Sequence, residues 1–138
     1  MARIQLVGLA AVVALAALVA ACGGSSTSPS DSGSGGGSST TPGPIAATIT
    51  ITASGVSPKS VTIPVGSSVN FVNNDSKPHD MASDPHPVHT DCPPINLVGI
   101  LSPGQSRATA AMSPARTCGF HDHNDDTNTS LRGTIVVQ

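Results

Sequence analysis

Aromatic side chains are almost absent from this chain, and their scarcity limits what the chain can fold into. The 138 residues include two Phe, Phe71 and Phe120, and no Trp or Tyr. A hydrophobic core must therefore be built mainly from Val, Ile, Leu and Ala, which bury less surface per residue than aromatic rings do. A small domain with such a core often needs a disulfide or a metal ion for stability. We therefore expect one or both in this protein.

The N-terminal segment has the composition of a targeting signal. Arg3 precedes an apolar run over residues 4–21, which ends in Val-Ala-Ala directly before Cys22. The run is close in length to a membrane-spanning helix, so an uncleaved anchor is one interpretation. Small residues before a Cys, with Gly and Ser after it, instead resemble a bacterial lipobox. This resemblance implies that residues 1–21 are a signal peptide and that Cys22 carries a lipid, which would anchor the protein to a membrane of the bacterial cell envelope.

The segment after the signal peptide is unsuited to forming a core. Residues 22–44 consist mainly of Gly, Ser, Thr and Pro, with Asp31 as their only charged residue. Such a segment buries too little apolar surface to offset its ordering entropy, so we expect a disordered linker. The folded domain is then residues 45–138. The formal net charge of the chain is -2 and there is no basic cluster, which argues against nucleic-acid binding.

Short alternating patterns predict β-strands throughout the domain. Residues 45–52 place Ile and Ala on one face and mainly Thr on the other, which is typical of a half-buried strand. Turn signals such as Ser54-Gly55 separate the patterns, and no helical period of useful length occurs. We therefore predict an all-β domain, a β-sandwich. The remaining strand patterns, two of them weak, lie at residues 61–65, 69–71, 96–101, 106–112 and 134–137.

Histidine and cysteine gather in two stretches that we expect to be loops. The five His all lie between positions 79 and 123, and six of the eight acidic residues lie in the same stretches. Imidazole and thiolate are preferred ligands of copper and zinc. Solvated loops would explain the Asp residues but not the clustered His and Cys. The sequence therefore predicts a metal site from two groups: His79, His86, His89 and Cys92, and Cys118, His121 and His123.

The order of these motifs resembles the cupredoxins, the family of plastocyanin and azurin. Residues 57–66 and 69–75, followed by His79, resemble the two strands that deliver the first copper-binding His of that family. Cys118-Gly119-Phe120-His121 resembles the Cys-x-x-His ligand pair, and residues 133–137 resemble the closing strand. The resemblance implies a Greek-key β-sandwich or barrel. It also implies a periplasmic protein, not an enzyme, that transfers single electrons to a protein partner through one copper ion.

Carried over by resemblance, the in-plane copper ligands would be His79, Cys118 and His121. The longer Cys-x-x-x-x-His spacing of azurin-like loops would select His123 instead of His121. A trigonal site with two His and one Cys suits one-electron exchange. The weak axial Met of the family is missing, because Leu131 stands in its place.

The second domain cysteine supports a different site. Two Cys in a small exported domain most often form a disulfide, and a Cys92–Cys118 bridge would leave the metal to imidazoles. The ligands would then come from His79, His121 and His123, with His86 and His89 as auxiliary ligands and an Asp as a further candidate, in a protein that captures or delivers copper. We keep both alternatives. The bridge requires Cα atoms within about 7 Å of each other, and either alternative leads us to expect His121 or His123 to face His79.

An enzymatic alternative rests on one motif. Residues 119–123 resemble the Gly-Phe-His-x-His strand of copper/zinc superoxide dismutases, in which alternate His point to one face. Those enzymes use further His downstream of that strand, and no His follows His123. We therefore expect a binding protein and not a dismutase.

Overall fold

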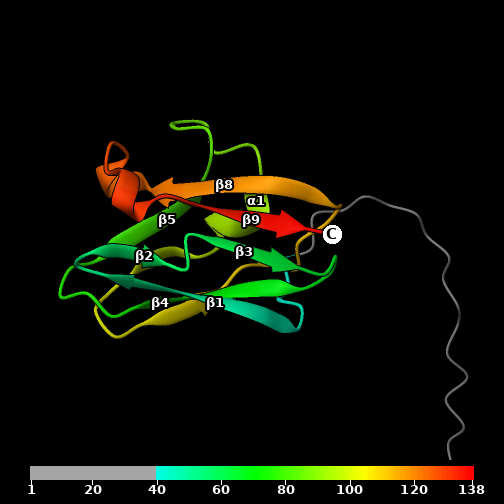
Figure 1. Ribbon diagram of the computed structural model, residues 1–138, viewed down its shortest axis with the longest axis horizontal. Coiled ribbons are helices and arrows are strands. Elements are labelled where there is room, and N and C mark those ends of the chain that lie inside the picture. The colour runs from blue at the N-terminus through cyan, green and yellow to red at the C-terminus, as the bar shows by residue number, and fades with distance from the viewer. Residues whose placement is uncertain (1–39) are drawn as a thin grey trace, which may run out of the picture. The chain divides into compact units, whose positions relative to one another are not determined.

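Two β-sheets make up the domain in the computed structural model, which describes residues 40–138 (Figure 1). The first sheet has the order β2-β1-β4-β7, formed by β1 Ile45–Thr52, β2 Gly55–Ser57, β4 Ser68–Asn73 and β7 Ser106–Ala108. The second has the order β3-β9-β8-β5-β6, formed by β3 Ser60–Ile63, β9 Gly133–Val137, β8 Arg116–Asp122, β5 His79–Ser83 and β6 Gly99–Leu101. The predicted all-β class is confirmed.

Helical structure within residues 40–138 is limited to three short pieces. These are the helix α1 Pro93–Asn96 and the 3-10 turns η1 His123–Asp125 and η2 Thr129–Leu131. None of the helices in this part of the chain is long and apolar enough to cross a membrane. The predicted signal peptide, Cys22 and most of the predicted linker lie outside the described residues.

Both sheets are mixed, because each contains one parallel pair. Strand β1 pairs in parallel with β4, and β3 pairs in parallel with β9. The other pairs are antiparallel, including β8 with both β5 and β9. Strand β9 therefore joins β3 to the rest of its sheet.

The ordered domain begins before Ile45, where the sequence pattern places its start. The Thr41 carbonyl accepts a hydrogen bond from the backbone N–H of Ala111 at 3.0 Å. The Gly43 N–H donates to Ser68 Oγ at 2.8 Å, and the Pro44 carbonyl accepts from the Ser68 N–H at 2.9 Å. The last residues of the predicted linker are therefore attached to the first sheet.

The two aromatic residues join the sheets at the centre of the core. Phe71 on β4 and Phe120 on β8 are fully buried, and their rings meet edge to face with centroids 5.2 Å apart. Such a pair stabilises the fold by about 0.5–1.5 kcal/mol beyond the contribution of the apolar area that the rings bury. The remaining core is aliphatic, as predicted. It includes Ile49, Ile51, Ile63, Val69, Leu101 and Ile135.

A disulfide supplements this small core. Cys92 and Cys118 are bonded, with their Cα atoms 5.8 Å apart, and both are buried. The bond fastens the residue before α1 to strand β8. The segment of residues 84–92, which leaves the end of β5, is therefore held at both of its ends.

Candidate metal site

The pairing of β5 with β8 sorts the polar residues of these strands onto two faces. Met81 lies opposite Asp122, and Ala82 lies opposite His121. Directly opposed residues of an antiparallel pair project to the same face, and neighbours along a strand project to opposite faces. Asp122 therefore shares the core face with Met81 and Phe120. His121 projects to the outer face, which the segment of residues 84–92 covers.

His121 is held in place by a carboxylate from that segment. Its side chain is fully buried, and its Nδ1 lies 2.7 Å from Asp84 Oδ1. The other ring nitrogen, Nε2, is buried and has no hydrogen-bond partner among the described residues. A carboxylate on one nitrogen fixes the imidazole tautomer and leaves the lone pair of the other nitrogen free, as in metal-binding His.

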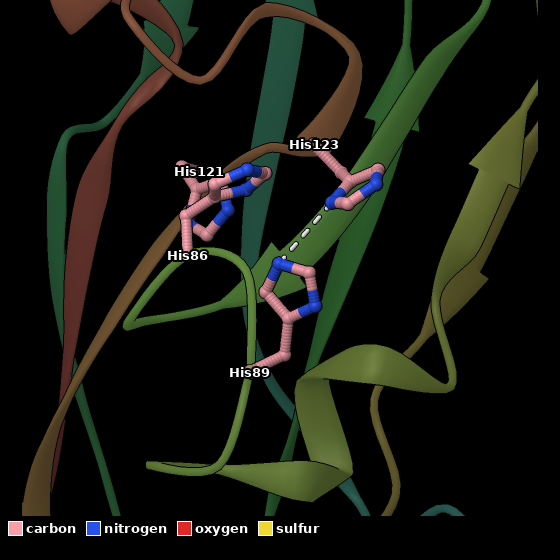
Figure 2. Close-up of side chains that lie close together, drawn as sticks. All are labelled: His86, His89, His121 and His123. Carbon is pink, nitrogen blue, oxygen red and sulfur yellow. Dashed lines mark hydrogen bonds between the residues drawn. The ribbon is translucent and has the colours of Figure 1, made fainter.

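Three more imidazoles lie close to the ring of His121 (Figure 2). His86 and His89 come from the segment of residues 84–92, and His123 comes from η1, two positions beyond His121. One ring nitrogen from each of the four His can be chosen so that all lie within 4.8 Å of one another. His89 Nε2 and His123 Nδ1 are 3.2 Å apart. Nitrogens bound to one tetrahedral metal at about 2.0–2.1 Å would be about 3.4 Å apart, so this pair already has the spacing of two ligands.

The electrostatics of this four-histidine site favour the neutral form of His89. The pKa of His89 is lowered, first by partial burial and then by repulsion from His121, His123 and His86, while Asp80 opposes the shift. Neutral imidazole is the form that binds a metal ion. His86 Nε2 lies 3.9 Å from Asp126 Oδ2 at the exposed side of the site.

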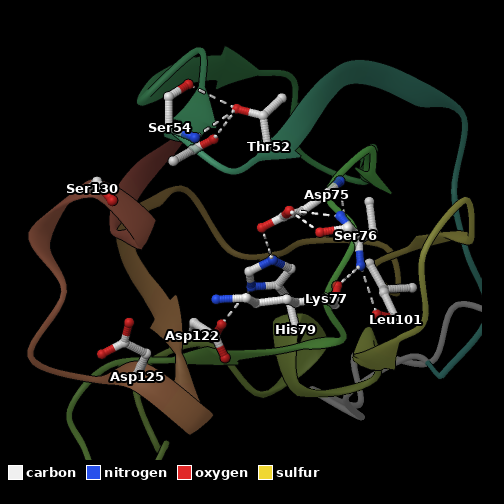
Figure 3. Close-up of polar contacts among 12 residues, drawn as sticks. Thr52, Ser54, Asp75, Ser76, Lys77, His79, Leu101, Asp122, Asp125 and Ser130 are labelled. Atoms are coloured by element: carbon white, nitrogen blue, oxygen red, sulfur yellow. Dashed lines mark hydrogen bonds and ion pairs between the residues drawn. The ribbon is translucent and has the colours of Figure 1, made fainter.

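His79 lies in a separate polar cluster on the core face (Figure 3). Its Nδ1 is 2.7 Å from Asp122 Oδ2 and its Nε2 is 3.1 Å from Asp75 Oδ2, so a carboxylate occupies each ring nitrogen. The pKa of Asp75 is lowered, chiefly by the hydrogen bond that the Ser76 N–H donates to it, with a further contribution from His79. The strand register places His79 and His121 on opposite faces. The expectation that His121 or His123 faces His79 is therefore wrong, and a ligand role for His79 stays a prediction.

Of the two alternatives for Cys118, the structure has the disulfide. A sulfur bonded to Cys92 cannot act as a thiolate ligand, and Cys118 also lies on the core face, away from the imidazole of His121. The residues predicted as auxiliary ligands, His86 and His89, are full members of the four-histidine site. Leu131, at the place of the axial Met, is buried in η2.

Sequence reasoning missed Asp84, which positions His121. The residue in the sequence most directly related to this role is Gly119, because a Cβ atom there would lie 2.1 Å from Asp84 Oδ2. Only a glycine leaves room for this carboxylate beside β8.

Neither a protein-family model nor a curated protein sequence matches this chain. Solved structures do. A purple cupredoxin from Nitrosopumilus maritimus has a TM-score of 0.53 and 22% identity, and the match covers 67% of this chain and 99% of that one. The fold is that of the cupredoxins.

Two further cupredoxin structures agree with this assignment. Amicyanin from Paracoccus versutus has a TM-score of 0.53 at 22% identity, over 67% of this chain and 80% of that one. Oxidised plastocyanin from the fern Dryopteris crassirhizoma has a TM-score of 0.52 at 19% identity, over 66% of this chain and 99% of that one. Likeness at such identities concerns the cupredoxin fold alone, and function depends on the site that this chain builds on it.

Proposed function

We propose that this protein binds one copper ion through His86, His89, His121 and His123, and that it captures or delivers that ion in the cell envelope. The observation that carries the proposal is that Nε2 of His121 is buried without a partner in the described part of the chain, on a ring that lies close to three other imidazoles. Leaving a buried polar atom unsatisfied costs about 1–3 kcal/mol. A metal bond at this atom would remove the cost, since the Asp84 contact already orients the ring.

Ligand chemistry and the fold together favour copper as the ion. Imidazole binds both copper and zinc, but a given set of ligands holds Cu²⁺ more tightly than Zn²⁺. The similar solved structures include an amicyanin variant with Cu(I). Copper is therefore the first ion to test, with zinc as the competitor.

The disulfide favours capture or delivery over electron transfer. Fast one-electron exchange in the cupredoxin-like ligand set relies on a thiolate, and the sulfur of Cys118 is bonded to Cys92. Two of the four His, His86 and His123, are exposed, which suits exchange of the ion with another ligand. The predicted lipid at Cys22 would hold the protein at a membrane, where a copper-transfer or redox protein could reach it.

Copper titration of the purified full-length protein tests the proposal. We expect one Cu²⁺ per chain and a weak, pale absorption band, because all ligands are imidazoles; an intense visible band would indicate a thiolate. His121→Gln should lower the copper affinity by more than the ~10–100-fold effect of losing an outer-shell partner. His79→Gln is the matched control, a second buried His in the other polar cluster, and should keep its copper. The opposite pattern would refute the proposal and support the ligand set implied by the cupredoxin resemblance.

A further inference from the structure

The four-histidine site opens to solvent through a neighbouring pocket. The pocket has a volume of about 340 Å³ and lies against the outer face of β5. His89 and His123 form part of its wall, together with Asp80, Val88 and Asn96. His121 is fully buried and lies outside this pocket. One route from solvent to an ion in the site therefore runs past His89 and His123.

Exposed apolar side chains lie near this opening. Five large hydrophobic residues are exposed in the described part of the chain, and three belong here: Val88, Leu97 and Ile100. Val88 lines the pocket, Leu97 directly follows Asn96, and Ile100 lies opposite Asp80 across the β5–β6 pair, so that it shares the outer face. Single exposed hydrophobic residues are common, but a group of them beside a binding site indicates an interaction surface.

The pocket also carries an unpaired negative charge. The carboxylate of Asp80 forms no hydrogen bond or ion pair with any described residue, although its backbone N–H donates to Asp122 Oδ1 at 3.0 Å. None of the described residues that line the pocket is Lys or Arg. A ligand with a positive charge would complement this wall.

We propose that this pocket, which we call the exchange pocket, binds a peptide segment of a partner protein. The partner gives copper to the four-histidine site or takes it away. The segment would carry a copper ligand, an apolar side chain for the rim of Val88, Leu97 and Ile100, and a positive charge for Asp80. A volume of this size lies at the lower end of the range for ligand pockets and suits a short segment. The inference rests on the proposed copper site.

Transfer through the exchange pocket is a ligand exchange without redox chemistry. The bonds from Cu²⁺ to the nitrogens of the peptide break as bonds to His89 and His123 form, and bonds to His86 and His121 then complete the site. Copper stays in the same oxidation state, and the released nitrogens of the peptide take up protons from water.

Two copper–peptide complexes that differ only in charge test the proposal. Glycyl-histidyl-lysine amide and glycyl-histidyl-glutamate amide both hold Cu²⁺ through the glycyl-histidyl unit. Stopped-flow mixing with the metal-free full-length protein gives the transfer rate from each. The lysine peptide should transfer about tenfold faster, the lower end of the range for electrostatic steering. Asp80→Asn should abolish this preference, and the ratio of the two rates cancels any change in copper affinity.

A second pair of variants tests the apolar rim. Val88→Thr should slow transfer from both peptides by about threefold or more, since part of the apolar contact between peptide and rim would be lost. Ile45→Thr, which changes another exposed apolar residue on β1, should leave both rates unchanged. Equal rates from the two peptides, or a preference that survives Asp80→Asn, would overturn the inference while leaving the copper site intact. A protein that binds no copper at equilibrium would refute the proposed function instead.

Discussion

Replacing both Cys92 and Cys118 by Ala should lower the free energy of unfolding by about 3.5 kcal/mol. The disulfide joins residues that are 26 positions apart. A loop of that length in the chain-entropy relation gives about 12 cal/mol/K, which is about 3.5 kcal/mol at room temperature. Both sulfur atoms are buried, so lost packing adds to this value. The loss would be a large fraction of the ~5–15 kcal/mol that stabilises a typical domain.

Urea denaturation followed by far-ultraviolet circular dichroism measures the change, because the chain has no Trp or Tyr for fluorescence. With a denaturant slope near 2 kcal/mol/M, the midpoint should fall by about 2 M. The wild-type protein reduced with dithiothreitol is the matched control and should unfold at nearly the same urea concentration as the double variant. A decrease below about 1 kcal/mol would refute the view that the bond compensates for a small core.

Three further predictions follow from particular contacts and from the N-terminal motif. Gly119→Ala should weaken copper binding about tenfold or more, because the new Cβ would displace Asp84 from His121. Competition with a chelator measures the affinity, and an unchanged value would contradict the positioning role of Asp84. The native pKa of Asp75 lies below its ordinary value of 3.8, so its ionised form stabilises the fold above that pH, and this stability should disappear as the pH falls through the native pKa. Asp75→Asn should therefore flatten acid denaturation curves in this range, and an identical curve would contradict the assignment. Cys22→Ser should release the protein from membranes or block its maturation; a fully processed variant in the membrane fraction would contradict the predicted lipid anchor.

The sequence predicts strands β1, β4 and β9 better than strands β5 and β8. Strands β1 and β4 alternate apolar and polar residues, since one face of each packs on the core, and β9 contains a run of Ile and Val. Strands β5 and β8 lie in stretches that the sequence indicates as loops, because buried polar residues break their pattern. His79 and Asp122 are such residues, and each satisfies the polar atoms of the other across the strand pair.

The composition of the candidate metal site is visible in the sequence, but its geometry is not. Clustered His residues predict a metal site, and the four that gather include His86 and His89. Motif order singles out His79 because it follows a cupredoxin-like pattern. Strand register then places it on the opposite face from His121, and a one-residue difference in register would reverse that result. The path of the segment that carries His86 depends on the disulfide and on the Asp84–His121 contact, which are both long-range.

The position of β9 in its sheet has a consequence for the order in which the chain can fold. Strand β3 pairs only with β9 among the described strands, and β8 needs β9 on the side away from β5. Residues 133–137 are made long after β3. Until they arrive, β3 and β8 expose unpaired edges, and such edges are where β-sheets recruit other chains. Completion of the second sheet is therefore a late event, and a chain delayed before this step would be most prone to aggregate.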